Sequence, residues 1–385
     1  MTRRTGVALC AVALLLGAAL SARACSLCNG NLQQAPTFRQ EAVSPNARLV
    51  LVGTIRNPRL NGDGSGTSEL HLDAVLRPDP VLKDRKVVVL KRYLPVSDPR
   101  NPPRFLVFCD VFKGELDPFR GVPLKTADAV NYVKKAVALP QRDTAGNLAF
   151  FFNYLEHPDP EVARDAFLEF AKATDPDIGQ AARKFAPDKL RRWLKDPQTP
   201  PERLSVYALM LGACGGADDA ALLGSLLKES GERVVNAYDG ILGGYIHLRP
   251  REGWEVALTT LRDGRKPLPM RLAVARTLRF YHGWQPKESL SNVLKGLEAM
   301  IAQGELADVA VEDLRRFQLW DLTREVLGLY GKPGYNAPLM QRAIVRYALS
   351  AKEDAATRGF LAERRRAEPD LVKEVEESLE FEKQK

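Results

Sequence analysis

Residues 271–280 read RLAVARTLRF, and they follow a proline-bearing stretch, DGRKPLPM, at 263–270. Apolar residues recur here every three to four positions, which is the period of one face of an α-helix. Three further turns rich in proline or aspartate are followed by comparable stretches: 163–171 (ARDAFLEFA), 203–211 (RLSVYALML) and 341–349 (QRAIVRYAL). The four copies predict a repeated unit of helix, turn and helix.

A leucine precedes each of these turns, and the spacing of the leucines gives the length of the unit. Leu155, Leu194, Leu261 and Leu329 are separated by 39, 67 and 68 residues. The first interval holds one helix pair, and each of the others has room for a second, less regular pair. A pair with a single apolar stripe cannot bury that stripe alone, so neighbouring pairs must stack. We therefore predict an α-solenoid, with an irregular helical domain as the alternative.

These segments resemble HEAT repeats in their length and in the Pro/Asp turn between the helices. The resemblance covers about Leu148 to Leu349, within a helical domain that we place at 148–367. It implies an extended array whose concave face binds another macromolecule. Residues 368–385 contain the charged amphipathic segment DLVKEVEESLEF, which would suit a terminal cap with a polar outer face.

The preceding part of the chain has the pattern of β-strands. Short runs rich in Val, Leu and Phe are separated by clusters of Gly, Asn, Asp and Pro, as is typical of strands and turns. The runs are 48–55, 69–76, 86–94 and 104–112. They predict a small β-barrel or sandwich at 25–120, joined to the helices by a linker at 121–147. The expected fold class is therefore α+β with several domains.

This β domain also resembles a known family. Its N-terminal cysteine pair and the motifs Val52-Gly53-Thr54, Asp73-Ala74-Val75-Leu76 and Phe105-Leu106-Val107-Phe108 resemble the netrin-like modules. The resemblance implies an OB-like barrel of the kind found in secreted proteins and in metalloproteinase inhibitors. Those inhibitors begin with Cys-x-Cys, whereas this chain has Cys-x-x-Cys and only Cys109 from the later set of paired cysteines. The resemblance therefore supports the fold more than the inhibitory activity.

The first 24 residues have the three parts of a signal peptide. Arg3 and Arg4 give a positive start, residues 7–20 form an apolar run, and the small-residue sequence Ala-Arg-Ala ends at Ala24. Cleavage between Ala24 and Cys25 would send the protein to the periplasm, the cell envelope or the outside. A transmembrane anchor is the alternative, but the apolar run is shorter than the roughly 20 residues needed to cross a bilayer.

Lipid attachment is a further alternative, because Cys25 would stand first after cleavage. Lipoprotein signals usually carry leucine three residues before that cysteine and a small residue at the next position. Here those positions hold Ala22 and Arg23, which favours export without a lipid. We expect a membrane association only if Cys25 is lipidated.

Four cysteines remain once Cys10 leaves with the signal peptide. Cys214 lies in an apolar stretch and is expected to be a small buried thiol. Secreted domains favour disulfides, so we expect one bond from Cys25 or Cys28 to Cys109, tying the N-terminus to the β domain. The spacing of Cys25 and Cys28 also suits a shared metal ion or a reducible disulfide.

A zinc site needs about four ligands, and the sequence has no second Cys-x-x-Cys and no histidine pair. Cys109 and His71 could join Cys25 and Cys28 only if the fold brought them together. We therefore predict no cofactor, with zinc binding or thiol-redox chemistry at the cysteine pair as the alternative function. Asn29 follows Cys28 where haem attachment requires histidine.

Charge and missing motifs narrow the remaining functions. The formal net charge of +8 falls to +5 without the three arginines of the signal peptide, and it is not concentrated in a basic stripe that would indicate nucleic acid. The glycine-rich segments 212–216 and 240–244 follow helical runs, so they predict helix ends or close helix packing. No nucleophile-elbow, Walker A, zinc-protease or dinucleotide motif is present in the sequence. We predict no catalytic residues and an exported scaffold that binds a protein partner, while an enzyme built from dispersed residues stays open.

Overall fold

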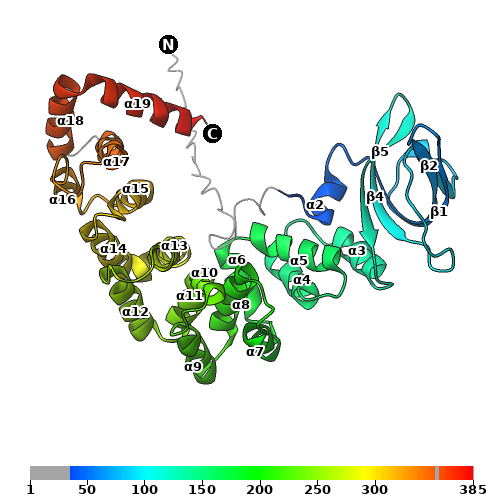
Figure 1. Ribbon diagram of the computed structural model, residues 1–385, viewed down its shortest axis with the longest axis horizontal. Helices are drawn as coiled ribbons and strands as arrows, with labels where there is room; N and C mark the ends of the chain where they lie inside the picture. The colour runs from blue at the N-terminus through cyan, green and yellow to red at the C-terminus, as the bar shows by residue number, and fades with distance from the viewer. Residues whose placement is uncertain (1–34, 352–354, 385) are drawn as a thin grey trace, which may run out of the picture.

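The computed structural model shows an α+β protein in which an antiparallel sheet is followed by a long series of helices (Figure 1). It describes residues 35–351 and 355–384. The predicted signal peptide, its cleavage point and the Cys25–Cys28 pair lie outside the described residues. Among the helices that are described, none combines the length and apolarity that a membrane span requires.

The sheet has five strands in the order β3-β2-β1-β4-β5, and every neighbouring pair is antiparallel. The strands are β1 (Leu49–Leu60), β2 (Gly66–Arg77), β3 (Val87–Leu90), β4 (Arg104–Phe112) and β5 (Glu115–Leu124). Within the described part of the chain no ladder joins β3 to β5, so the sheet is open. In place of the predicted barrel or sandwich the structure has one open sheet. Its edge strand β3 has only four residues, and the short helix η1 (Pro80–Leu82) contacts β5 at the other edge.

The two faces of the sheet bury different cores, because successive side chains on a strand point to opposite faces. Leu51 of β1 and Val107 of β4 face a small core that η1 closes with Leu82. Val52 and Phe108 face the other side, where they join the main core of the helical region. The sheet is therefore continuous with the helices through one of its faces.

A buried polar junction fixes the first helices against the sheet. It involves α2 (Phe38–Val43), α3 (Ala129–Ala138) and α5 (Pro160–Lys172). The carboxylate of Asp165 on α5 accepts hydrogen bonds from the Phe38 backbone N–H at 2.7 Å and from the Tyr132 hydroxyl at 2.6 Å. All three helices thus meet at one carboxylate. The stretch 121–147, predicted as a linker, contains the end of β5, all of α3 and the start of α4.

The helices add one after another along an open arc, with the sheet at one end and α19 at the other (Figure 1). Contacts join helices that are close in the chain, such as α8 with α11, α11 with α13, and α15 with α17. The remaining elements are α4 (Thr144–Phe151), η2 (Phe152–Tyr154), α6 (Asp175–Ala182), α7 (Pro187–Lys195), α8 (Pro201–Cys214), α9 (Ala217–Leu226), α10 (Glu232–Asn236), α11 (Tyr238–Leu248), α12 (Pro250–Arg262), α13 (Leu268–Trp284), α14 (Pro286–Ala302), α15 (Ala307–Phe317), α16 (Thr323–Leu327), α17 (Pro338–Ser350), α18 (Ala355–Ala367) and α19 (Pro369–Lys383).

Each helical stretch predicted from the repeat pattern lies inside one helix: α5, α8, α13 and α17. All four helices carry a proline in their first two positions, where its missing N–H costs no intrahelical hydrogen bond. The charged segment near the C-terminus lies in α19, as predicted. Local periodicity and turn chemistry therefore located these helices correctly.

Glycines allow α8 and α11 to pack with their backbones in contact. A Cβ atom on Gly244 would lie 2.2 Å from the carbonyl oxygen of Ala208, and one on Gly240 would lie 2.1 Å from that of Ser205. Gly215 ends α8 as its C-cap residue. The predictions of close packing and helix ends for the two glycine-rich segments are confirmed.

Candidate interaction surface

The two sequence-predicted ligands that the structure describes, Cys109 and His71, lie apart. Cys109 pairs with Leu49 of β1, whereas His71 pairs with Thr54, five residues further along that strand. Five residues of strand span about 17 Å, so the two side chains cannot share a metal ion. His71 instead lies 3.0 Å from a carboxylate oxygen of Glu69. In the described ranges no three His, Cys, Asp or Glu side chains are grouped to hold a metal.

Neither Cys109 nor Cys214 forms a disulfide among the described residues. The predicted bond from Cys25 or Cys28 to Cys109 stays a prediction, because both of those partners lie outside the described residues. Cys109 is fully buried in the small core of the sheet, and this burial, with the nearby charge of Asp117, raises its pKa to about 12. Cys214 is half-buried at the end of α8, and burial raises its pKa to about 11. A thiol reacts as its thiolate, so neither environment activates the sulfur.

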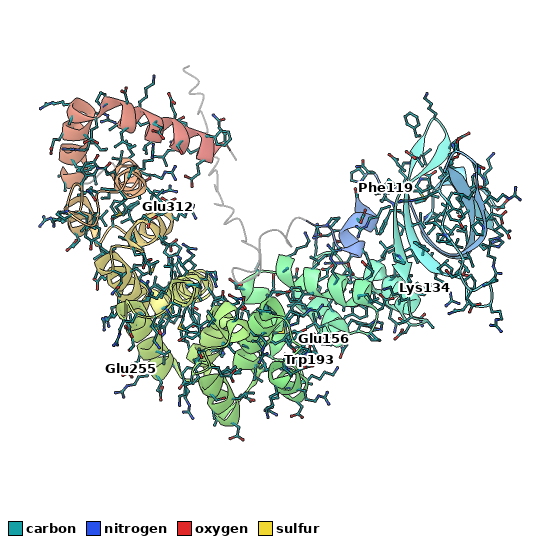
Figure 2. The ribbon with its side chains drawn as sticks, viewed as in Figure 1. Phe119, Lys134, Glu156, Trp193, Glu255 and Glu312 are labelled. Carbon is teal, nitrogen blue, oxygen red and sulfur yellow. The ribbon has the colours of Figure 1, made fainter. Side chains whose placement is uncertain are left out.

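A more extended candidate site lies on the inner side of the arc. Here α13, α15 and α17 stand inside, while α12 and α14 pack behind α13 (Figure 1). Figure 2 shows Glu312 of α15 on the inner side and Glu255 of α12 on the outer side. The helices α13, α15 and α17 thus follow one another along the inner side of the arc.

Arginines on α13 face this inner side. Arg276 and Arg279 are three residues apart and lie on one face of the helix, opposite the residues that pack against the core. The Arg276 Nε donates to Asp239 of α11 at 2.5 Å. The Arg279 Nε donates to both carboxylate oxygens of Asp313 on α15, at 2.9 and 2.8 Å. The two arginines therefore connect α13 to the inner helices on either side.

Burial in these two pairs is uneven. The aspartate side chains of Asp239 and Asp313 are 4% and 2% exposed, whereas the side chains of Arg276 and Arg279 are 38% and 39% exposed. Burial raises the pKa of Asp313 above its ordinary value, and the adjacent Arg279 opposes that rise. The acidic partner is thus enclosed, and part of each arginine is open to solvent.

Further arginine–carboxylate pairs lie toward the C-terminus, although their acidic partners are more exposed than Asp239 and Asp313. Glu312 of α15 lies 3.7 Å from Arg346 of α17, and Arg342 of α17 pairs with Glu374 of α19 at 3.0 Å. Although burial disfavours the charge of Glu312, its ion pairs, with Arg315 foremost, hold its pKa below the ordinary value. We call Arg276, Arg279, Arg342 and Arg346 the inner arginine row.

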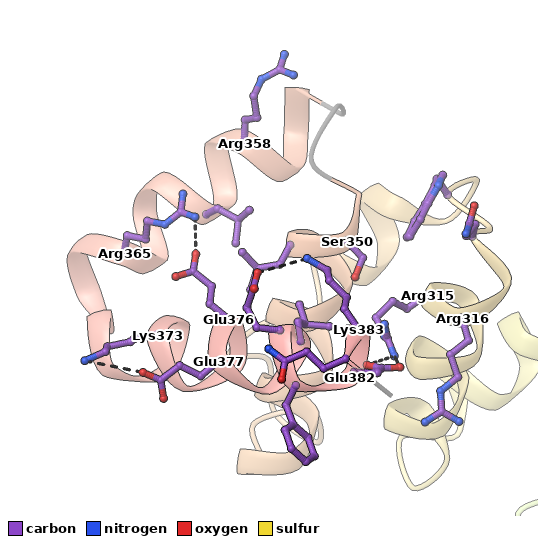
Figure 3. A pocket seen from close by; sticks show the side chains of 18 residues that line it. Arg315, Arg316, Ser350, Arg358, Arg365, Lys373, Glu376, Glu377, Glu382 and Lys383 are labelled. Carbon is purple, nitrogen blue, oxygen red and sulfur yellow. Dashed lines mark hydrogen bonds and ion pairs between the residues drawn. The ribbon is translucent and has the colours of Figure 1, made fainter. Parts of the chain in front are cut away.

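A groove lies beyond the end of this row, between α18, α19 and the ends of α15 and α17 (Figure 3). It has a volume of about 1460 Å³. Leucines contribute its apolar part, and ion pairs such as Arg365–Glu376 at 2.7 Å and Arg315–Glu382 at 2.9 Å line its sides. The groove therefore offers a mixed apolar and charged surface next to the arginine row.

Comparison with protein-family models, with curated proteins and with solved structures gives no match.

The arginine row was not predicted from the sequence, although one signal for it was present. When the segments 271–280 and 341–349 are aligned, Arg276 and Arg346 occupy the same position. A basic residue repeated inside an otherwise apolar pattern indicated a shared role on one helix face.

Proposed function

We propose that this chain is an exported, non-enzymatic interaction protein that binds a partner protein through the inner face of its helices. In this proposal the helices form an α-solenoid of HEAT-like pairs. The carrying observation is that described helices contact close neighbours along the chain and leave an inner surface open across α13, α15 and α17. Quasi-linear arrays of this type use such surfaces for extended contacts with other proteins.

We assign the N-terminal module to the netrin-like group, as an open variant of an OB-like barrel. An OB-fold is a five-stranded and partly open barrel. Two observations support the assignment: one face of the sheet encloses its own small core, and the edges of the sheet approach each other. Lys91, just after β3, lies 3.6 Å from Glu115 at the start of β5.

The proposal is tested with a bulky side chain that blocks the inner face and leaves the fold intact. A side chain added at Gly283 on α13 meets open space, since no heavy atom lies within 4 Å of the position that its Cβ would take, and the same holds for Gly359 on α18. The mature chain, beginning at Cys25, is immobilised and incubated with an envelope extract. Retained proteins are compared for the wild type, Gly283→Trp and the matched control Gly359→Trp.

We expect one partner to be retained by the wild type and by Gly359→Trp, and to be lost with Gly283→Trp. Equal retention by both variants would place the binding surface elsewhere. An extract from which the wild type retains no protein contradicts the proposed function itself. The alternative function at Cys25 and Cys28 is addressed separately, by elemental analysis and thiol titration of the mature chain. Absence of both a bound metal and a reducible thiol pair would rule it out.

A further inference from the structure

We propose that Arg276 and Arg279 form a binding subsite for carboxylates, and that the segment of the partner that docks there is acidic. The inference rests on the proposed function and specifies the chemistry of the partner at one place on the inner face. It follows from the way in which the two guanidinium groups are held.

Each guanidinium is fixed at its Nε atom, while its two terminal nitrogens are free. Both arginines bond to their aspartates through Nε alone. Among the described residues, the terminal nitrogens of Arg276 and Arg279 have no hydrogen-bond partner in the protein, and these side chains are more than one-third exposed. Four terminal nitrogens therefore face the inner surface with their hydrogen-bond donors unused.

The buried aspartates also hold these donors in place. Asp239 is itself fixed, because its carboxylate accepts a hydrogen bond from the Ser205 hydroxyl at 2.9 Å and from the Gly240 backbone N–H at 2.8 Å. An arginine anchored to such a group has already lost much of its side-chain freedom. A ligand that binds it then loses less entropy than it would at a mobile surface arginine.

Carboxylate is the ligand that fits this arrangement best. A guanidinium presents its donors in a planar fork that matches the two oxygens of a carboxylate. Residues three apart on a helix have Cβ atoms about 5–6 Å apart, and the two guanidiniums reach to either side of α13. Each can therefore take a separate carboxylate of one extended peptide. Because each arginine is already paired with an aspartate, the subsite has little net charge. It therefore favours short-range hydrogen bonding over the long-range attraction that polyanions such as nucleic acid require.

The test uses a fluorescent ten-residue peptide of alternating Glu and Ser, with a Gln/Ser peptide as its uncharged match. Binding to the purified mature chain is followed by fluorescence anisotropy. Arg279→Lys keeps a cation beside Asp313 but replaces the planar guanidinium fork with a single ammonium, and Arg276→Lys does the same beside Asp239. Arg265→Lys is the matched control, because Arg265 pairs with Asp263 on the turn before α13 and its side chain is 92% exposed.

We expect the Glu/Ser peptide to bind more tightly than the Gln/Ser peptide. Each of Arg279→Lys and Arg276→Lys should weaken its binding roughly tenfold, as loss of a charge-assisted fork implies, and Arg265→Lys should leave it unchanged. Circular dichroism checks that each variant is folded. If one of the two inner variants does not fold, the other alone is sufficient for the test. Unchanged binding in the folded inner variants, equal binding of both peptides, or displacement by equimolar inorganic phosphate overturns the inference.

These outcomes are separable from those for the proposed function. If the peptide binds through the arginines and the extract yields no partner, the subsite stands and the proposed function fails. If a partner is retained through the inner face while the peptide shows no dependence on the arginines, the function stands and the acidic nature of the docking segment is wrong.

Discussion

Asp165 should make the stability of this protein fall as the pH rises toward neutrality. Its carboxyl group is 2% exposed at the junction of α2, α3 and α5. Burial raises its pKa from the ordinary value of 3.8 to about 7, against the opposing hydrogen bonds from Tyr132 and Phe38. The folded protein therefore binds this proton more tightly than the unfolded chain does.

The sign follows from that difference. The contribution of the Asp165 proton to stability is fully present below pH 3.8 and is lost as the pH rises toward about 7. Each pH unit in that window corresponds to about 1.4 kcal/mol, so the whole effect amounts to about 4 kcal/mol. Asp165→Asn removes the ionisation but keeps an acceptor for the Phe38 N–H and a polar partner for Tyr132. The free energy of unfolding of Asp165→Asn should therefore rise relative to that of the wild type by about 3 kcal/mol between pH 4.5 and pH 7.5.

The assay is urea unfolding at several pH values between 4.5 and 7.5, followed by far-ultraviolet circular dichroism. Subtracting the wild-type curve from that of Asp165→Asn cancels the other titrating groups, to the extent that they are independent of this site. Asp263→Asn is the matched control, since Asp263 lies on an exposed turn and hydrogen bonds to Arg265 lower its pKa. A stability difference for Asp165→Asn that stays constant across this range would refute the reasoning.

Three further predictions concern the helix packing and the thiols. Gly244→Ala should lower the free energy of unfolding by about 1–3 kcal/mol, because its Cβ would meet the Ala208 carbonyl. Gly243→Ala, whose Cβ would be 3.5 Å from Leu209, should be neutral or stabilising by up to about 1 kcal/mol in the same thermal melts. After reduction, Cys109 should resist maleimide in the folded protein and react on unfolding, as peptide mass mapping would show, and labelling in the folded state contradicts its burial. The intact mass of the mature chain should correspond to cleavage before Cys25 with no acyl group and should rise by two hydrogens on reduction. An added lipid mass, or no rise, contradicts those two expectations.

Helices and strands with strong local patterns could be predicted from the sequence. The apolar period of 271–280 and the prolines at the helix starts are local properties, and α13 begins and ends close to where they indicate. β5 was not among the predicted strands, and it contains Pro118 and Pro123, which are unusual inside a strand. The structure places both on an edge strand, where a missing N–H is tolerated.

Features that depend on distant residues could not be predicted in the same way. The contact of η1 with β5, for example, joins segments far apart in the chain. The partners of the arginine row come from other helices: Arg276 from α13 meets Asp239 from α11, some 37 positions away. Sequence alone showed the repeated arginine but not the buried carboxylate that orients it.

The most direct test of the central claim is site-specific photo-cross-linking in cells that produce the protein. One probe replaces Gly283, which shares a face of α13 with Arg279 and has open space around its Cβ position. A second probe replaces Glu255, which lies on the outer side of the arc (Figure 2). We predict a discrete cross-linked partner from position 283 and none from position 255. Cross-links from position 255 alone, or from neither position, would contradict binding through the inner face.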